Sequence, residues 1–286
     1  MPNTLHSPIA PPPLFVDHAK GRTWLKWHRG RRCATDMEFD PRRIIEGMRL
    51  GASVEIDIVR HAGGGFAVLH DDTLERATTG SGRVCEASRQ TLETLWRRGN
   101  EGQVTDVPVA LLSDLCRAIA TEGTEDTAVL QLDLKETNET LTPADILAFA
   151  EALAPITNHA ILSAGDAKAV QRLSKALPVL RIGHDPCHFG TRETLAASGD
   201  DQAFIAQTLH GAEGADMIYL DIRLIFNALE RGTDLIAAFH AKGHRIDAYT
   251  VSKITPQTVD LCRKLMALGV DQITTDDPER LYAAGI

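Results

Sequence analysis

Short apolar runs alternate along the chain with longer segments in which apolar residues recur at helical spacing. Strands separated by a helix of about ten or more residues pair in parallel through crossover connections. We therefore expect parallel strands at residues 24–27, 53–58, 128–134, 160–163, 179–182, 217–220, 245–251 and 272–274. We expect helices at residues 41–50, 110–121, 143–154, 167–176, 201–210, 232–242 and 256–268.

Eight strand–helix units in a chain of 286 residues predict a (β/α)8 TIM barrel, a fold of roughly 250 residues. An open doubly wound sheet is the alternative, and it carries a glycine-rich phosphate loop after its first strand. Here Gly63-Gly64-Gly65 lies between two β-like runs, which favours a hairpin turn. Barrel enzymes build their sites at the carboxyl ends of strands. Polar residues near the predicted strand ends are His28, Asp57, Lys135, Ser163, Asp221 and Thr250.

The domain organisation follows from the same pattern. We expect residues 1–23 to form a proline-rich amino-terminal arm that lies over the domain, and residues 24–286 to form a single catalytic domain. The longest departure from regular alternation is residues 60–108, after the second strand. We expect this segment to be a small excursion over the mouth of the barrel.

Composition excludes several classes of partner. The net charge of −9 argues against nucleic acid and anionic membranes, because both need a basic surface. The five cysteines are far apart and odd in number, which favours a reducing compartment. The first 24 residues lack a signal-peptide pattern, and no apolar stretch approaches the ~18 residues of a membrane span. We therefore expect a cytoplasmic protein without stable membrane insertion.

Two pairs of charged residues on strands predict a metal site. Glu55 and Asp57 are two residues apart on a strand, so both side chains project to one face. Like charges in such a pair repel unless a cation lies between them; otherwise they are a solvated pair on an edge strand. Asp133 and Lys135 share a face of the third strand, where they are either functional or a structural ion pair. Three carboxylates would hold one divalent cation, Mg²⁺ or Ca²⁺, and Lys135 would bind a phosphate.

Histidines end two of the strand-like runs. His28 and His70 are candidates for acid–base catalysis, because imidazole titrates near neutral pH. Arg29 offers a planar set of donors suited to phosphate oxygens. His61, beside the three glycines, is a candidate for contact with substrate at the mouth of the site. The combination predicts a metal-dependent enzyme acting on a small-molecule phosphodiester.

Six short motifs that include these residues occur in order along the chain. They are residues 28–30 (HRG), 51–58 (GASVEIDI), 70–80 (HDDTLERATTG), 132–135 (LDLK), 248–252 (AYTVS) and 269–276 (GVDQITTD). Their order and spacing resemble those of the glycerophosphodiester phosphodiesterase family, whose motifs read HRG, GA-x-x-E-x-DV, HD-x-x-L-x-R-TT-G, E-x-K, WTVN and GVDGIITD. The resemblance runs from His28 to about Leu281. It implies a TIM barrel and a phosphoric diester hydrolase.

The chain also departs from the family pattern. The segment PENT that follows HRG in the family is absent, and Glu38 stands in its place as a possible substrate contact. The third carboxylate is Asp133 where the family has Glu, and Tyr249 replaces a Trp. These changes fall where the leaving group of a substrate would lie.

The resemblance implies roles for the histidines. His28 would act as base on a substrate hydroxyl or on water, and His70 would protonate the departing alcohol. If the substrate hydroxyl attacks, a cyclic phosphate forms first and is opened by water. Asp71 would orient an imidazole.

Several substrates and one function without catalysis stay open. A glycerophosphodiester is the leading substrate, and a sugar phosphodiester of the phosphorylated opine (agrocinopine) type is the alternative. A sphingomyelinase D-like lyase that stops at the cyclic phosphate is a third interpretation. A catalytically inactive barrel that senses a phosphate ligand is the fourth.

Overall fold

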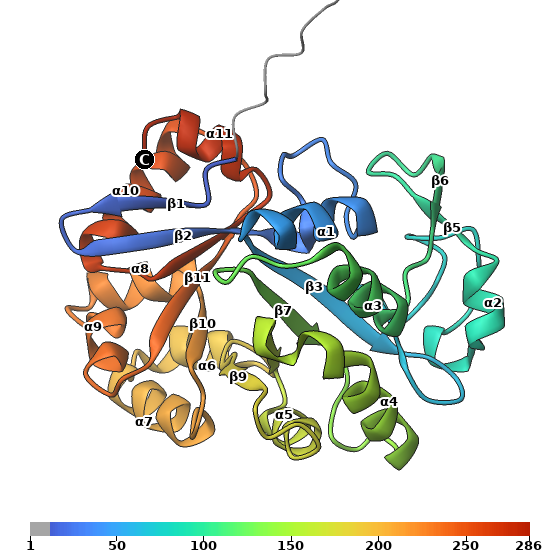
Figure 1. The fold of residues 1–286 in the computed structure, drawn as a ribbon. Helices are drawn as coiled ribbons and strands as arrows, with labels where there is room; N and C mark the ends of the chain where they lie inside the picture. The colour runs from blue at the N-terminus through green and yellow to red at the C-terminus, as the bar shows by residue number, and fades with distance from the viewer. Residues whose placement is uncertain (1–11) are drawn as a thin grey trace, which may run out of the picture.

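The computed structural model describes residues 12–286. Eight parallel strands form a closed barrel in the order β2-β3-β7-β8-β9-β10-β11-β12, and the pairing of β2 with β3 closes the ring (Figure 1). The predicted (β/α)8 barrel is confirmed, with each of the eight strands near its expected place. The strands are β2 (Gly21–Trp27), β3 (Ser53–Arg60), β7 (Val129–Leu134), β8 (Ala160–Ala164), β9 (Arg181–His184), β10 (Met217–Asp221), β11 (Arg245–Val251) and β12 (Gln272–Thr275).

Helices cover the outside of the barrel (Figure 1). Local sequence signals fix the ends of these helices, as α1 shows. At its start, Pro41 occupies the first turn and the Asp40 side chain accepts a hydrogen bond from the backbone N–H of Arg42. At its end, Gly51 stops the helix with a φ of 84°. The helices are α1 (Pro41–Leu50), α3 (Leu112–Glu122), α4 (Pro143–Leu153), α5 (Ala167–Ser174), α6 (Thr191–Ser198), α7 (Asp201–Gly211), α8 (Ile222–Glu230), α9 (Leu235–His240), α10 (Pro256–Leu268) and α11 (Pro278–Ala283).

The excursion after the second barrel strand is present as predicted. Its first element, β4 (Phe66–Ala67), pairs antiparallel with β3, so the three glycines form the expected hairpin turn. The rest contains α2 (Arg89–Glu93) and a two-stranded sheet of β5 (Trp96–Arg98) and β6 (Val104–Pro108). It packs around its own small apolar cluster and is joined to the loop before α1 by a buried arginine. This is Arg97, whose guanidinium donates to the carbonyl oxygens of Val68 and Glu38.

The predicted arm, residues 1–23, lies partly outside the described residues. Its described portion includes β1 (Phe15–His18), which pairs antiparallel with β2, and the Phe15 and Trp24 rings lie 5.3 Å apart. Among residues 12–286, no helix combines the length and hydrophobicity needed to cross a bilayer.

The outward and inward faces of each barrel strand have different roles, the first in folding and the second in function. Outward side chains such as Ile56 and Leu132 are fully buried against the helices, and each contributes about 1.5–3 kcal/mol by leaving water. Inward side chains are largely polar. Halfway along the barrel, Lys26 forms an ion pair with Asp247 at 2.9 Å, with both side chains almost completely buried. A buried pair of this kind needs further hydrogen bonds, and Thr274 donates one to Asp247 at 2.6 Å.

Candidate active site

A cavity of about 180 Å³ opens among the carboxyl ends of the barrel strands. It collects most of the side chains that the sequence singled out, from strands far apart in the chain. The predicted residues that line it are His28, Arg29, Glu55, Asp57, His70, Asp133, Lys135 and Tyr249.

Three other predicted residues lie outside this lining. Glu38 and Asp71 stand behind it, where Glu38 holds Arg29 and Asp71 holds His70. The structure does not bring His61 to the cavity. Because β3 continues into its hairpin with β4, His61 lies beyond the site in a separate hollow beside Gly64.

His28 lies where β2 ends in a tight turn. Gly30 adopts a φ of 70°, and a Cβ there would come within 2.7 Å of Ile44, so the turn requires glycine. The His28 ring is held from two sides: Nδ1 lies 2.5 Å from Asp276 Oδ1, and Nε2 lies 4.0 Å from Glu55 Oε2. A carboxylate at Nδ1 fixes the orientation of the ring and leaves Nε2 to face the cavity.

Arg29 forms part of the same turn. Its φ of 55° is unusual for a residue other than glycine, and its backbone N–H donates to Glu55 Oε2 at 2.7 Å. The guanidinium lies between two carboxylates, with Nη1 2.8 Å from Glu38 Oε1 and Nε 3.3 Å from Asp57 Oδ2. These contacts aim a fixed positive charge at the cavity.

Two buried carboxylates and a half-buried one come together on β3 and β7. Asp57 pairs in register with Asp133, and oxygens of Glu55, Asp57 and Asp133 all lie within 4.8 Å of one another. Burial, and then the charges of the two aspartates, raise the pKa of Glu55 well above its ordinary value. Asp57 Oδ2 is buried without a hydrogen-bond partner. A compact set of carboxylate oxygens, one of which accepts no hydrogen bond, fits a hard divalent cation.

Lys135 lies against this acidic group. Its Nζ is 2.7 Å from Asp57 Oδ1 and 2.6 Å from Asp133 Oδ2. Although burial alone would lower the pKa of Lys135, the charges of Asp133 and Asp57 raise it above its ordinary value. The ammonium group therefore stays charged at the edge of the cavity.

His70 enters the cavity from the excursion. Its Nδ1 lies 2.7 Å from Asp71 Oδ1, while Arg76 donates to the other oxygen of the same carboxylate. The hydrogen bond from Arg76, and then that from His70, lower the pKa of Asp71 to about 2. Asp71 is thus a permanent anion that orients the ring of His70.

The cavity has two walls that differ in composition. The acidic wall comes from β3, β7 and the residues directly after β2 and β7, and the opposite wall comes from the loop that follows β9, the start of α6 and β11, across the ring from the first. The acidic wall consists of His28, Arg29, Glu55, Asp57, Asp133 and Lys135. The opposite wall consists of Asp185, Cys187, His188, Arg192, Tyr249 and Thr250.

On the opposite wall a single carboxylate holds two polar side chains. Asp185 accepts a hydrogen bond from Tyr249 Oη at 3.0 Å and lies 3.0 Å from His188 Nε2. Burial, and then the charge of Asp185, raise the pKa of Tyr249, so its hydroxyl keeps its proton. Beside them, Arg192 donates to Asp221 at 2.9 Å. The sequence suggested that residues 184–188 form a loop that contacts substrate or solvent, but it gave no role to Asp276, even though this residue ends the last motif.

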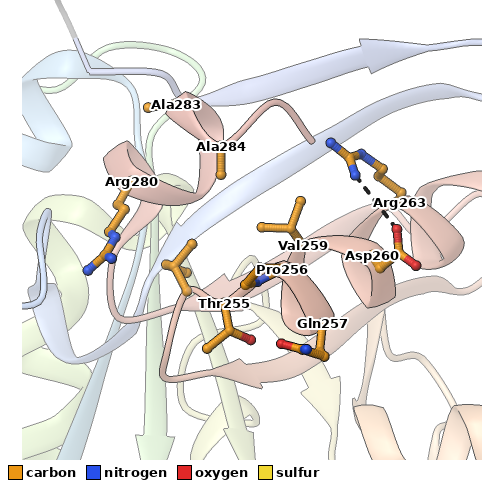
Figure 2. Close-up of a pocket in the computed structure, with 10 residues that line it drawn as sticks. Thr255, Pro256, Gln257, Val259, Asp260, Arg263, Arg280, Ala283 and Ala284 are labelled. Atoms are coloured by element: carbon orange, nitrogen blue, oxygen red, sulfur yellow. Dashed lines mark ion pairs between the residues drawn. The ribbon is translucent and has the colours of Figure 1, made fainter.

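A larger hollow of about 820 Å³ lies between α10 and α11, on the outside of the barrel (Figure 2). Its lining has the ion pair of Arg263 with Asp260 at 3.6 Å but neither a histidine nor a second carboxylate. No barrel-strand residue lines the hollow, and it lacks the groups for acid–base chemistry. The smaller cavity in the barrel is therefore the candidate active site.

Comparison with protein families agrees with this geometry. The model of the glycerophosphoryl diester phosphodiesterase family matches residues 44–280, most of the chain. The chain belongs to this family. Its members are phosphoric diester hydrolases, so the predicted enzyme class is confirmed. The matched region contains the acidic triad, His70 and Lys135. His28 and Arg29 precede it and reach the site because β2 pairs with β3.

Solved structures from the family share the fold. A glycerophosphodiester phosphodiesterase from Agrobacterium tumefaciens is 19% identical with a TM-score of 0.64, over 92% of this chain and 99% of that chain. An Oleispira antarctica phosphodiesterase in complex with the product sn-glycerol-3-phosphate is 18% identical with a TM-score of 0.62, over 91% and 95% of the two chains. At such identities the likeness shows the barrel alone. No curated protein matches the chain.

Proposed function

We propose that this family member is a metal-dependent phosphodiesterase that hydrolyses a glycerophosphodiester to an alcohol and glycerol phosphate. The observation that carries the proposal is the cavity itself: it is lined by His28 and His70, by the positively charged Arg29 and Lys135, and by the carboxylates of Glu55, Asp57 and Asp133, all in one space of about 180 Å³. Each of these groups meets a separate demand of phosphodiester cleavage, which needs proton transfer and stabilisation of charge on the phosphoryl oxygens.

In this proposal the positively charged side chains of Arg29 and Lys135 face the phosphate group of the substrate. Arg29 and Lys135 are both held by buried carboxylates, so their positions are fixed before substrate binds. Preorganised positive charge stabilises the phosphoryl oxygens without rearrangement during the reaction. Glu38 is a positioning residue here, because it binds the Arg29 guanidinium from behind.

The two histidines transfer protons. His28 removes the proton from the attacking hydroxyl, a new oxygen–phosphorus bond forms, and the bond from phosphorus to the departing oxygen breaks. His70 gives its proton to that oxygen, so the alcohol leaves neutral. If the nucleophile is the neighbouring substrate hydroxyl, the product is a cyclic phosphate, which water opens with the roles reversed. Asp276 and Asp71 orient the two rings.

Glu55, Asp57 and Asp133 would hold the divalent cation, Mg²⁺ or Ca²⁺. When bound, the ion supplies Lewis-acid polarisation of a phosphoryl oxygen. Asp133 is one methylene shorter than the glutamate of the family motif, but β3 and β7 pair in register and bring its oxygen within 4.8 Å of the other two. The fit of the triad does not depend on the longer side chain.

A second candidate substrate is a sugar phosphodiester, for which the opposite wall is the supporting observation. Asp185, His188 and Tyr249 present hydrogen-bonding groups where the family motif would put an indole ring. A polyhydroxylated leaving alcohol makes use of such groups, whereas a choline head group does not.

The five free cysteines and the acidic net charge support a cytoplasmic enzyme acting on a small molecule.

Phosphorus NMR of the purified protein tests both substrates. Glycerophosphocholine and a sugar 2-phosphodiester are each incubated with Mg²⁺, Ca²⁺ or a chelator. We expect glycerol phosphate from the first substrate only when metal is present, and turnover of the sugar diester alone would transfer the proposal to the second. If neither is cleaved, and phosphate protects wild type but not Arg29→Met against thermal unfolding, the result favours the inactive sensor.

A further inference from the structure

A second cavity lies at the opposite end of the barrel from the active site. It has a volume of about 410 Å³ and is lined by the amino-terminal ends of the strands. Its lining has two guanidinium groups together with apolar and uncharged polar side chains. The residues on which the argument rests are Arg181, Arg245, Ser53, Trp24, Ile161 and Met217.

The two arginines come from strands that flank β10. Met217 pairs with Arg245 in register, and the start of β9 puts Arg181 on the other side of β10. Both side chains point into the barrel, as inward positions of neighbouring strands do. The fold itself therefore brings two positive charges to one opening.

These charges are poorly compensated. No carboxylate in residues 12–286 forms an ion pair with Arg181, and Arg245 lies 3.9 Å from its nearest acidic partner, Asp216. Burial, and then the neighbouring charge of Arg245, lower the pKa of Arg181. The acidic residue in the cavity lining is Asp126, which is exposed. Two like charges held together in this way are unfavourable unless a counter-charge joins them.

A buried hydroxyl group in the same cavity also lacks a partner. Ser53 lines the cavity, is only 3% exposed, and its Oγ makes no hydrogen bond. Buried polar groups are nearly always hydrogen-bonded, so each exception requires an explanation. A ligand that accepts hydrogen bonds would satisfy Ser53 and compensate the arginines together.

We propose that this cavity binds a compact oxyanion, either inorganic phosphate or a phosphate monoester. The guanidinium groups match the geometry of phosphate oxygens, and Trp24, Ile161 and Met217 would contact the organic part of an ester. The site is separate from the catalytic one. Gln131 and Tyr219 line both cavities and form the partition between them, and Gly183 leaves room for the Tyr219 ring, since a Cβ there would lie 2.4 Å from it.

Calorimetry of the full chain with inorganic phosphate, at constant ionic strength, tests the proposal. We expect two sites in the wild type. Arg181→Met should weaken one of them at least tenfold and leave the other, while Arg29→Met should do the reverse. Arg263→Met is the matched control, because this exposed arginine lies outside both cavities, and it should change neither site. A single site that Arg181→Met does not affect would overturn the proposal.

A second variant covers the case in which Arg181→Met does not fold, and a crystal soak locates the anion without any substitution. If Arg181→Met does not fold, as judged by circular dichroism, Arg245→Gln replaces it, since the side chain of Arg245 is 48% exposed. Crystals soaked in tungstate locate the anion directly. An anomalous peak between Arg181 and Arg245 is the expected result, and peaks at the active site alone would overturn the proposal.

Discussion

The two walls of the active-site cavity are built by the same barrel, yet they follow the family pattern to different degrees. The acidic wall keeps nearly every residue type of the family motifs. The opposite wall has Tyr249 in place of a tryptophan and a carboxylate, Asp185, that ties Tyr249 to His188. Under the proposed function, this contrast predicts that bond cleavage and choice of leaving group depend on different strands.

The two walls also differ in how closely their charged groups are paired. On the acidic wall, Lys135 contacts two carboxylates within 2.7 Å, so removing one group leaves others buried and unpaired. On the opposite wall, His188 is 40% exposed and is held by one carboxylate. We therefore expect changes on the acidic wall to reduce kcat strongly, and changes on the opposite wall to alter KM and substrate preference.

The largest effect should follow from His28→Gln. Loss of a general base reduces kcat by about 100- to 10,000-fold, while KM should change little because the phosphate contacts of Arg29 and Lys135 remain. Steady-state hydrolysis of glycerophosphocholine measures both constants. His210→Gln, an exposed histidine at the end of α7, is the control. Activity within threefold of wild type in His28→Gln would remove His28 from the mechanism.

A smaller loss is expected from Asp276→Asn. The carboxylate orients His28 through a 2.5 Å contact with Nδ1, and misplacement of a catalytic group by about 1 Å costs up to about 100-fold. We expect kcat to fall about tenfold to 100-fold with KM unchanged. Asp277→Asn is the matched control, since its side chain caps α11 and asparagine caps helices equally well. Equal activity of the two variants would contradict the role of Asp276.

These two residues show what the sequence does and does not reveal. His28 could be identified as a candidate, because it ends an apolar run and begins a motif. Its contact with Asp276 joins residues 248 positions apart and depends on closure of the barrel, which brings β12 beside β2. The periodicity predicts a barrel but does not show which side chains face each other across its strands. On the opposite wall the sequence singled out Tyr249 but not its contact with Asp185, since these two residues meet only in the folded ring.

The fold was more accessible than the site. Each barrel strand has a run of outward apolar residues, and α1 and α10 have clear caps, so their bounds agree with the prediction. Besides the short α2 in the excursion, three helices were missed: α6, α8 and α11. The first is a single eight-residue segment between two glycines with positive φ. The second begins directly after β10, because Asp221 is both the last residue of the strand and the helix cap, so no loop signal separates them.

On the opposite wall, Tyr249→Phe tests specificity. The variant loses the hydroxyl that donates to Asp185 at 3.0 Å, and a single hydrogen bond contributes about 0.5–1.5 kcal/mol, or about two- to tenfold. We expect KM for the preferred diester to rise by that factor while kcat stays within twofold. Phosphorus NMR with glycerophosphocholine and the sugar diester in competition measures the change in preference. A large loss of kcat with both substrates would show that the two walls are not functionally separate.

The smallest effect concerns the pH dependence of stability. The hydrogen bond to Asp185 raises the pKa of His188 above 6.5, so the folded protein binds this proton more tightly than the unfolded chain. The stabilisation is therefore complete below about pH 6.5 and is lost as the pH rises through the folded-state pKa. Because the His188 side chain is 40% exposed, solvent screens the pair and limits its contribution to at most about 1 kcal/mol. Urea unfolding at pH 6 and pH 8 measures the free energy of unfolding of wild type and of His188→Gln. The difference between the two proteins should be smaller at pH 8 than at pH 6. A difference that does not change with pH would mean that packing alone accounts for the role of His188.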